Sequence, residues 1–529
     1  MIARARLLSL RENHRVGLFL APLFALYFLT RSVNIKGVPI FIDEAIYLKW
    51  ARDARAGRLW ASLLWDGKPP LHSWSMVPLL GVFRDPLVAG RATSILFGAL
   101  TTLGIFLIGK ELLDWKLGAI AAFLYVACPF ALWYDRLAIA ESMLLALFVF
   151  AIYFAVKAAR SGSAWYLIGT GIATGLALLT KGTATLIYPI AIFAYVVRDP
   201  REEPAEAKRP LVRWSVSIGV SLLVGFAILN MLRLSPKYTA RSHFIATRTK
   251  GITAALATPL KTLLRFNWSI FISILKYLTP AVLVIALAGL ALSLIKRWRP
   301  GYFLWLWLII GVAVISLVGR FAWPRFYLVL VPPLLLAAAY LLYEAGRLTA
   351  GAWSRSGQSR KKLLMYSTSV ALLILLIATA VPVASELSGM VQAKQGEGEY
   401  LKGRCAGVGL KETANLVKGL SRREKINVVV NDYFIQVALE MYASSPNVNV
   451  ITLKLEYRKG YSELLKSTIE RAACKRPTYV VMNGASGPVP SSWPLHVMEE
   501  FKKNDGGNRV SMYLAKATGF GQYRASLGR

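Results

Sequence analysis

Long apolar runs recur along the first 383 residues of this 529-residue chain, and they constrain its fold more than any other feature. Many of them reach roughly 18 residues, the length that an α-helix needs to cross the hydrocarbon core of a bilayer. Hydrophobic residues make up 56% of the chain and charged residues 17%, whereas soluble domains carry about a quarter charged residues. The sequence therefore predicts a helical membrane protein with several spans. It excludes a soluble enzyme, a disordered chain and a disulfide-stapled secreted domain.

The apolar runs predict about eleven transmembrane helices. Their expected positions are residues 16–33, 89–109, 116–134, 138–156, 164–180, 183–197, 213–232, 276–295, 301–319, 326–343 and 363–383. Beyond them the pattern changes, and we expect strands at 426–430, 448–453, 478–482 and 509–515 with a helix at 433–443. The predicted fold class is an all-α polytopic membrane domain over residues 1–383, followed by a small C-terminal α/β domain over residues 384–529.

The distribution of positive charge predicts how these spans are oriented. The net charge is +35, and Lys and Arg gather at the N-terminus and in alternate loops between the apolar runs. Cytoplasmic loops are enriched in these residues, so we expect a plasma-membrane protein with a cytoplasmic N-terminus and, for an odd number of spans, an extracytoplasmic C-terminal domain. Attraction to anionic lipid accounts for much of the excess charge. No DNA-binding pattern accompanies it, so nucleic acid is not an expected partner.

One loop departs from this charge rule. Residues 233–275 are expected outside the membrane, yet they carry seven Lys or Arg, and no Asp or Glu occurs from 207 to 343. Either the span count is wrong there, or the loop lies near an anionic group, which is the interpretation we favour. On charge alone, the candidate phosphate-binding residues of this loop are Arg241, Arg248 and Arg265.

Ionisable residues at the external face of the membrane define a candidate site, because charge near a bilayer is costly without a role. Asp43 and Glu44 follow the first span in the predicted loop 34–88. A carboxylate there can act as a general base or bind a divalent cation. The alternative is an acidic pair that only stabilises a helix N-terminus. In the same loop Lys68 precedes Pro69-Pro70, and a rigid turn of this kind suits a lysine that binds a phosphate oxygen.

Further candidates lie at the ends of later spans. Arg136 and Glu141 flank the start of the fourth predicted span, and Lys181 follows the fifth. Snorkelling of the Lys181 ammonium to the interface is a simpler explanation for that residue. Arg325 and Tyr327 stand at the entrance of the tenth span. Cations at this face would neutralise a departing phosphate while a carboxylate activates an acceptor, which suits an enzyme that uses a lipid phosphate as its leaving group.

The order of these motifs resembles the polyprenyl-phosphate-sugar-dependent glycosyltransferases of the C-type (GT-C) fold. The matching motifs are Asp43-Glu44, Lys68-Pro-Pro-Leu, Arg136-Leu-Ala-x-x-Glu141, Leu-Thr-Lys181-Gly, and Arg325-Phe-Tyr-Leu with Pro332. The most similar branch contains the protein O-mannosyltransferases and the lipid A aminoarabinose transferase. The resemblance covers residues 16–345 and is more specific for the superfamily than for a substrate.

The resemblance implies a hexosyl or pentosyl donor on polyprenyl phosphate, an inverting transfer on the external face, and a lipid, glycan or protein acceptor. By the same likeness Asp43 is the general base and Glu44 shapes its pocket. Lys68 and Lys181 would hold the donor phosphate, and Arg136 and Glu141 would order the cavity. Arg325 and Tyr327 complete the implied substrate-binding set.

The chain departs from the oligosaccharyltransferase branch of this superfamily. It lacks the Trp-Trp-Asp-Tyr-Gly motif and the first-loop Asp-x-Asp, so transfer of a whole oligosaccharide to asparagine is not implied. No metal ligand is assigned and no cofactor is required, although a bound divalent cation stays an open alternative. A membrane transporter of a lipid-linked or anionic substrate is the competing class, and it would need ionisable residues near the bilayer midplane.

Overall fold

The computed structural model describes residues 2–198, 210–236, 238, 259–318, 323–355, 407–453, 461–483, 493, 495–502 and 511–517 of the chain. The chain divides into two compact units. The first comprises Met1–Val33, Gly57–Ser75 and Arg91–Ser388, and the second comprises Asn34–Ala56, Met76–Gly90 and Gly389–Arg529. The boundary predicted at 383/384 lies outside the described residues and stays a prediction.

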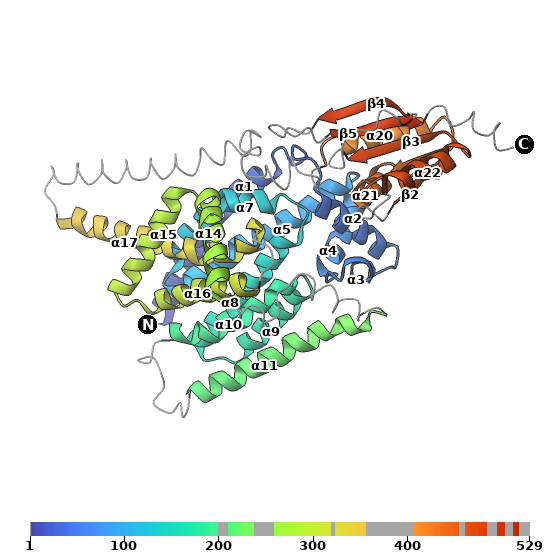
Figure 1. Ribbon diagram of the computed structural model, residues 1–529. Coiled ribbons are helices and arrows are strands. Elements are labelled where there is room, and N and C mark those ends of the chain that lie inside the picture. Colours follow the sequence, from blue (N-terminus) through green and yellow to red (C-terminus); the bar gives the residue numbers. More distant parts are fainter. Residues whose placement is uncertain are drawn as a thin grey trace, which may run out of the picture. The chain divides into compact units, whose positions relative to one another are not determined.

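Helices make up almost all of the first unit, which appears from blue to yellow in Figure 1. Its first half contains α1 (Ile2–Ser32), α3 (Ala61–Asp66), α6 (Trp115–Val126), α7 (Pro129–Asp135), α8 (Ala140–Ser161), α9 (Trp165–Leu178), η1 (Gly182–Leu186), α10 (Ile187–Ile192) and η2 (Phe193–Val197). Its second half contains α11 (Pro210–Asn230), η4 (Met231–Leu234), α14 (Pro259–Leu278), α15 (Pro280–Ile295), α16 (Arg299–Val318), η5 (Pro324–Leu330) and α17 (Val331–Arg355). Two helices cross from one unit to the other, α4 (Leu71–Val82) and α5 (Pro86–Leu112).

The predicted count of about eleven spans is not confirmed. Among the described residues, five helices are long and apolar enough to cross a membrane, or seven if each of two bent pairs counts as one span. Two further apolar helices, Trp165–Leu178 and Gly182–Val197, are shorter, and the predicted span 363–383 lies outside the described residues. The described residues therefore fit a multi-pass membrane protein, and within them several apolar runs form short or bent helices.

Prolines explain the two bends. The helix axis turns by 65° between α6 and α7 and by 113° between Ile270–Leu278 and α15. Pro129 and Pro280 are the first residues of α7 and α15, and Thr279 has a left-handed φ of 74°. Proline lacks the N–H that continues a helix and disfavours helical geometry in the residue before it. Continuous apolar runs at 116–134 and 276–295 therefore do not form continuous helices.

Close packing holds the helices of the first unit together. α9 packs between α8 and α11, and α17 packs against α15, α16 and α6. At one crossing a Cβ on Gly289 of α15 would lie 2.0 Å from the carbonyl oxygen of Ala337 in α17, so only glycine permits this approach. Buried side chains such as Phe148 and Trp307, whose rings stack 5.9 Å apart, fill the interior.

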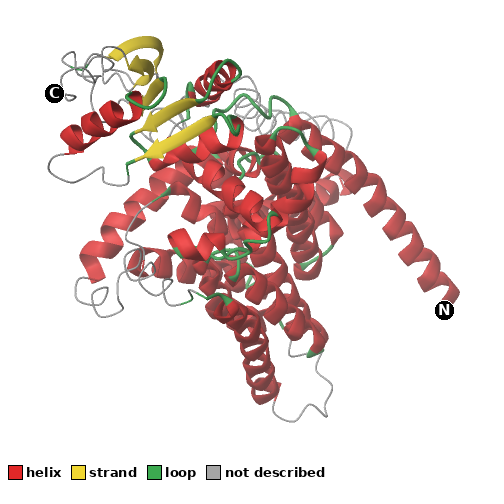
Figure 2. Ribbon diagram, turned by 90° about the vertical axis from the view of Figure 1, so that its right-hand side faces the viewer, coloured by secondary structure: helices red, strands yellow, loops and turns green. Residues whose placement is uncertain are grey.

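The second unit contains the α/β domain expected at the C-terminus. Its strands are β1 (Ile426–Val430), β2 (Val448–Thr452), β3 (Thr478–Asn483), β4 (Leu495–Lys502) and β5 (Ser511–Ala517), and its helices are α2 (Ile42–Arg55), α20 (Leu410–Ser421), α21 (Tyr433–Tyr442) and α22 (Tyr461–Ala473). The sheet has the order β2-β1-β3-β5-β4, with β1 parallel to both β2 and β3 and with β5 antiparallel to its neighbours. The strands, yellow in Figure 2, all belong to this domain. The four predicted strands and the predicted helix are confirmed, whereas β4 was not predicted.

Candidate functional site

Glu141 is the centre of a charged cluster in the first unit. It lies in the first turn of α8 and is only 3% exposed. Lys181 Nζ donates a hydrogen bond of 2.5 Å to Glu141 Oε1, and Arg325 Nε lies 3.7 Å from the same oxygen. The fold thus brings together three motif residues that are 40 to 184 positions apart in the sequence. Two cations share one carboxylate oxygen in this charged cluster (Glu141, Lys181 and Arg325).

Aromatic rings support the two cations of this cluster. Lys181 Nζ lies 4.7 Å from the centre of the Phe326 ring, and the Arg325 guanidinium lies 5.9 Å from the rings of Phe326 and Trp323. These distances fit cation–π contacts, which stabilise a positive charge without neutralising it. The predicted site residue Tyr327 is fully buried in η5, beside this pair.

The Lys68-Pro-Pro turn lies against the turn that carries Lys181. Gly67 ends α3 in the left-handed conformation with φ 59°, and Lys68 and the two prolines follow it. Leu71 N–H, at the start of α4, then donates to the carbonyl of Leu179, over 3.0 Å. Lys68 is partly buried. Both predicted phosphate-binding lysines thus lie in segments that contact each other.

His72 follows this turn and is fully buried. Burial lowers the pKa of its imidazole to about 4, because an apolar environment disfavours the protonated ring, although the nearby Glu141 carboxylate opposes this shift. The imidazole is therefore neutral at pH 7. His72 interacts electrostatically with Glu141 and Lys181, so the segment that follows Lys68-Pro-Pro lies near the charged cluster.

A second buried network precedes Glu141 in the sequence. Arg31 Nε lies 3.6 Å from Asp135 Oδ2, and the hydroxyls of Tyr27 and Tyr125 each donate to Asp135 over 3.1 Å. At the next position, Arg136 Nη2 donates to the carbonyl of Val33 over 2.8 Å. The network joins α1, α6 and α7 and so fixes the backbone that leads into Glu141. Sequence analysis did not identify this network. Arg31 and Asp135 each lie near the end of an apolar run, but nothing in the sequence indicates that they pair with each other.

Asp43 and Glu44 lie in the second unit, in the first turn of α2. The Glu44 carboxylate is fully buried and accepts a hydrogen bond of 2.9 Å from the backbone N–H of Phe41. It therefore satisfies one of the N–H groups that a helix leaves without a partner at its start. Asp43 is partly exposed. The two adjacent carboxylates thus differ in burial, but both lie in the first turn of α2, where the alternative of an acidic pair at a helix start fits each of them.

The basic loop cannot be included in this site. Arg241 and Arg248 lie outside the described residues, and Arg265 falls in α14, where its side chain is not described. A metal centre is not visible in the part of the chain that the structure describes, because no three His, Cys, Asp or Glu side chains come together there.

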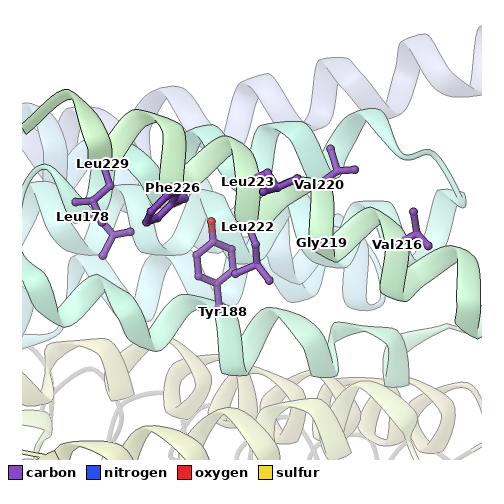
Figure 3. Close-up of a pocket in the computed structure, with 9 residues that line it drawn as sticks. All are labelled: Leu178, Tyr188, Val216, Gly219, Val220, Leu222, Leu223, Phe226 and Leu229. Atoms are coloured by element: carbon purple, nitrogen blue, oxygen red, sulfur yellow. The ribbon is translucent and has the colours of Figure 1, made fainter. Parts of the chain in front are cut away.

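An apolar groove of about 690 Å³ runs along α11 in the first unit (Figure 3). Its lining residues are Leu178, Tyr188, Val216, Gly219, Val220, Leu222, Leu223, Phe226 and Leu229. The Tyr188 ring rises between them, and its hydroxyl donates to the carbonyl of Ser221 over 3.0 Å. The single polar side chain of the lining is therefore satisfied, and the groove offers hydrocarbon alone.

One end of this groove lies close to the motif residues. Leu178, at that end, precedes Lys181 by three positions. Leu229 packs against a buried cluster of Leu63, Leu179 and Leu232, and Leu71 of the Lys68-Pro-Pro-Leu turn packs against the same cluster. One end of the groove is thus joined by packing to the turns that carry Lys68 and Lys181.

Sequence comparison identifies a family match over part of the chain. Residues 67–231 match the family described as dolichyl-phosphate-mannose-protein mannosyltransferase. Lys68, Arg136, Glu141 and Lys181 all lie within this match. No curated protein sequence matches the chain significantly.

Comparison of folds extends the similarity to nearly the whole chain. ArnT from Cupriavidus metallidurans in the apo state has a TM-score of 0.56 and 15% identity, with 96% of this chain and 98% of that chain covered. ArnT bound to undecaprenyl phosphate gives a TM-score of 0.53 and 14% identity, over 96% of this chain and 99% of that chain. The archaeal oligosaccharyltransferase AglB from Archaeoglobus fulgidus, in complex with an inhibitory peptide and a dolichol-phosphate, gives 0.54 and 14% identity, over 89% of this chain and 70% of that chain.

These comparisons confirm the resemblance that the sequence motifs predict. The chain resembles the polyprenyl-phosphate-sugar-dependent glycosyltransferases of the GT-C fold, by sequence over residues 67–231 and by fold over nearly its whole length.

Proposed function

We propose that this chain is a membrane glycosyltransferase that moves a sugar from a polyprenyl-phosphate carrier to a lipid, glycan or protein acceptor on the external face of the membrane. The observation that carries the proposal is the cluster of Glu141, Lys181 and Arg325 beside the Lys68-Pro-Pro turn. The cluster places two cations at one oxygen of a buried carboxylate, and the neighbouring turn carries a third cation, Lys68. A donor phosphate would meet these cations.

The donor phosphate is proposed to bind to Lys68, Lys181 and Arg325. Phosphate becomes more negative as its bond to the sugar breaks, so fixed cations stabilise the transition state more than the bound donor. Glu141 would hold Lys181 and Arg325 in place, and Arg136 would hold the backbone before Glu141. On charge alone, Arg241, Arg248 and Arg265 are proposed as further phosphate contacts.

The apolar groove along α11 is the proposed site of the isoprenoid chain of the donor. It is lined by hydrocarbon (Figure 3). At one end Leu229 packs against the cluster that Leu71, of the Lys68-Pro-Pro-Leu turn, also contacts. A polyprenyl phosphate has the same two parts in the same order, an apolar chain and an anionic head. Its chain would lie along α11 while its phosphate meets the cations.

Asp43 is the proposed general base. Its carboxylate would accept the proton of the acceptor hydroxyl or amine as that group attacks the anomeric carbon of the sugar. The bond between the anomeric carbon and the phosphate oxygen breaks, its electron pair leaves with the phosphate, and the configuration inverts. Glu44 would shape the base's surroundings, because its own carboxylate is engaged with the backbone of Phe41. The N-terminus is proposed to be cytoplasmic, so that this chemistry takes place outside the cell and serves envelope glycosylation.

The experiment that tests this function is the release of free polyprenyl phosphate. Purified parent protein and Asp43→Asn would each receive polyprenyl-phosphate sugars and a membrane extract as the acceptor source. We expect release by the parent and a loss of about 10³-fold or more in the variant, since a positioned base contributes about 10²–10⁴-fold. Release by neither protein would favour a transporter of a lipid-linked substrate. Equal release by both would remove Asp43 as the base.

A further inference from the structure

We infer that the C-terminal α/β domain positions the helix that carries Asp43, through contacts at both ends of α2. The inference rests on the proposed function, because the reaction is what gives the position of Asp43 its importance. It assigns a role to the C-terminal domain, for which the sequence analysis gives only a fold class and an expected side of the membrane. All the contacts that carry it lie inside the second unit.

The C-terminal end of α2 is fastened to the C-terminal end of α21. Arg52 Nη1 donates to the carbonyl oxygens of Glu440 and Met441, over 3.0 and 3.4 Å. The last carbonyls of a helix have no partner within it, and a guanidinium there satisfies them and complements the helix dipole. Arg52 of α2 therefore supplies an end cap for α21.

An ion pair reinforces the same contact. Lys49 Nζ lies 3.4 Å from Glu440 Oε2, and Gln436 Nε2 donates to the other oxygen of that carboxylate over 2.7 Å. Between these polar contacts α2 buries an apolar face, in which Leu48 and Ala51 are fully buried. Helices α2 and α21 pack directly on each other, as Figure 1 also shows.

The segment before α2 is fixed by a different part of the same domain. A Cβ on Gly407 would lie 2.1 Å from the carbonyl oxygen of Ile40, so the backbones at these two positions touch. Close by in the sequence, Lys411 Nζ donates to Asp85 Oδ2 over 2.9 Å, and Lys36 Nζ lies 3.5 Å from the same oxygen. Residues 407–411 thus contact the segment before α2 and the turn at Asp85 between α4 and α5.

These two attachments lie on either side of Asp43. Ile40 is three residues before it and Arg52 is nine residues after it. Nine helical residues span about 13 Å, so a tilt of about 5° around Arg52 would move the Asp43 carboxylate by about 1 Å. A misplacement of about 1 Å can lower the rate of a reaction by about 10²-fold. The C-terminal domain would therefore control the rate of transfer without touching the donor.

Two pairs of variants test this role. Arg52→Ala removes the cap on α21, whereas Arg52→Lys keeps a donor for the same carbonyls. Gly407→Ala forces the backbone away from Ile40, whereas Gly419→Ala adds the same methyl group where no atom lies within 4 Å. Arg422→Ala, at an exposed position of the same domain, controls for the loss of an arginine. For each protein, kcat, the donor KM and the thermal unfolding temperature would be measured alongside Asp43→Asn.

We expect Arg52→Ala and Gly407→Ala to lower kcat by about 10- to 100-fold while the donor KM changes by less than about twofold, as a misplaced base predicts. Arg52→Lys should recover most of kcat, and both control variants should match the parent. An unchanged kcat in Arg52→Ala and Gly407→Ala, with Asp43→Asn inactive, would overturn the positioning role and leave the proposed function standing. A parent without transfer, or a fully active Asp43→Asn, would overturn the proposed function and this inference with it. A fall of kcat that only follows a fall in unfolding temperature, without recovery in Arg52→Lys, would also overturn it.

Discussion

Two carboxylates from the predicted motifs have opposite environments in the two units of the chain. Glu141, in the first unit, is almost completely buried and lies between Lys181 and Arg325. Asp43, in the second unit, is partly exposed in the first turn of α2, and its neighbour Glu44 is the one that caps the helix. The Glu141 carboxylate is engaged by both cations through the same oxygen, Oε1. The comparison therefore separates a residue that contacts two cations from the one that we propose as the general base.

Among the variants that test this comparison, Glu141→Gln is expected to lower the stability of the protein most. Removing one partner of a buried ion pair leaves a buried charge without compensation and costs about 3–5 kcal/mol. The thermal unfolding temperature in detergent should therefore fall strongly. Glu111→Gln is the matched control, because the ion pair of Glu111 with Lys157 is partly exposed and such pairs contribute less than about 1 kcal/mol. Equal losses in the two variants would show that burial does not set the importance of Glu141.

The pH dependence of stability should show the next effect, through His72. Its folded-state pKa of about 4 lies below the ordinary value of 6.5, so protons bind the unfolded chain more readily. The contribution of His72 to the free energy of unfolding is therefore fully present above pH 6.5. It falls by roughly 3 kcal/mol as the pH drops from 6.5 to 4, at 1.36 kcal/mol per pH unit. In His72→Gln this part of the fall should disappear. Unfolding curves of both proteins between pH 7 and 4 measure it, and identical slopes would contradict the assignment.

Lys181→Met should mainly weaken the binding of the donor. A hydrogen bond to a charged group contributes about 1.5–3 kcal/mol, so the donor Kd should rise by about 10- to 100-fold. Methionine keeps the apolar stem of the side chain against Phe326. Lys116→Met, at an exposed position of the same unit, should leave the donor Kd unchanged. If both variants bind the donor like the parent, Lys181 has only a structural role.

The smallest effect is expected from Glu44→Gln. The loss of a helix-capping carboxylate costs about 0.5–2 kcal/mol, and glutamine keeps a weaker acceptor for the N–H of Phe41. Stability should fall slightly and transfer should persist at reduced rate, in contrast to Asp43→Asn. A loss of transfer as complete as that of Asp43→Asn would assign acid–base chemistry to both carboxylates.

The sequence predicted the local features of the molecule more completely than its long-range ones. Apolar runs located many of the helices, and short runs rich in β-branched residues located β1, β2, β3 and β5, because both signals come from residues close together in the chain. The predicted loop 34–88 instead contains α2, α3 and α4, and α14 begins inside the predicted loop 233–275. The bends at Pro129 and Pro280 were readable in principle, since the prolines are visible, but composition alone made each run look continuous. The strand β4 (Leu495–Lys502) contains Glu499, Glu500 and Lys502, and its charged residues hide its pattern.

For the candidate site, the sequence named the residues but not all of their partners. The motifs named Glu141, Lys181 and Arg325 as separate candidates, and the fold brings the three into contact. The pairing of Arg31 with Asp135 joins residues 104 positions apart, and no local pattern specifies such a partner. The predicted domain boundary at 383/384 also did not anticipate that residues 34–56 pack with the C-terminal domain. Contacts of this kind depend on the tertiary fold.

The most direct test of the central claim is to compare the binding of polyprenyl phosphate with that of the polyprenol of equal chain length. Both lipids would be titrated into the parent protein in lipid nanodiscs. We propose that the charged cluster binds the phosphate and that the α11 groove binds the isoprenoid chain. Polyprenyl phosphate should then bind about 100-fold more tightly than the polyprenol, because it gains charge-assisted hydrogen bonds to two cations. Equal affinity for the two lipids would contradict the account, because the cations around Glu141 would then not recognise the donor phosphate.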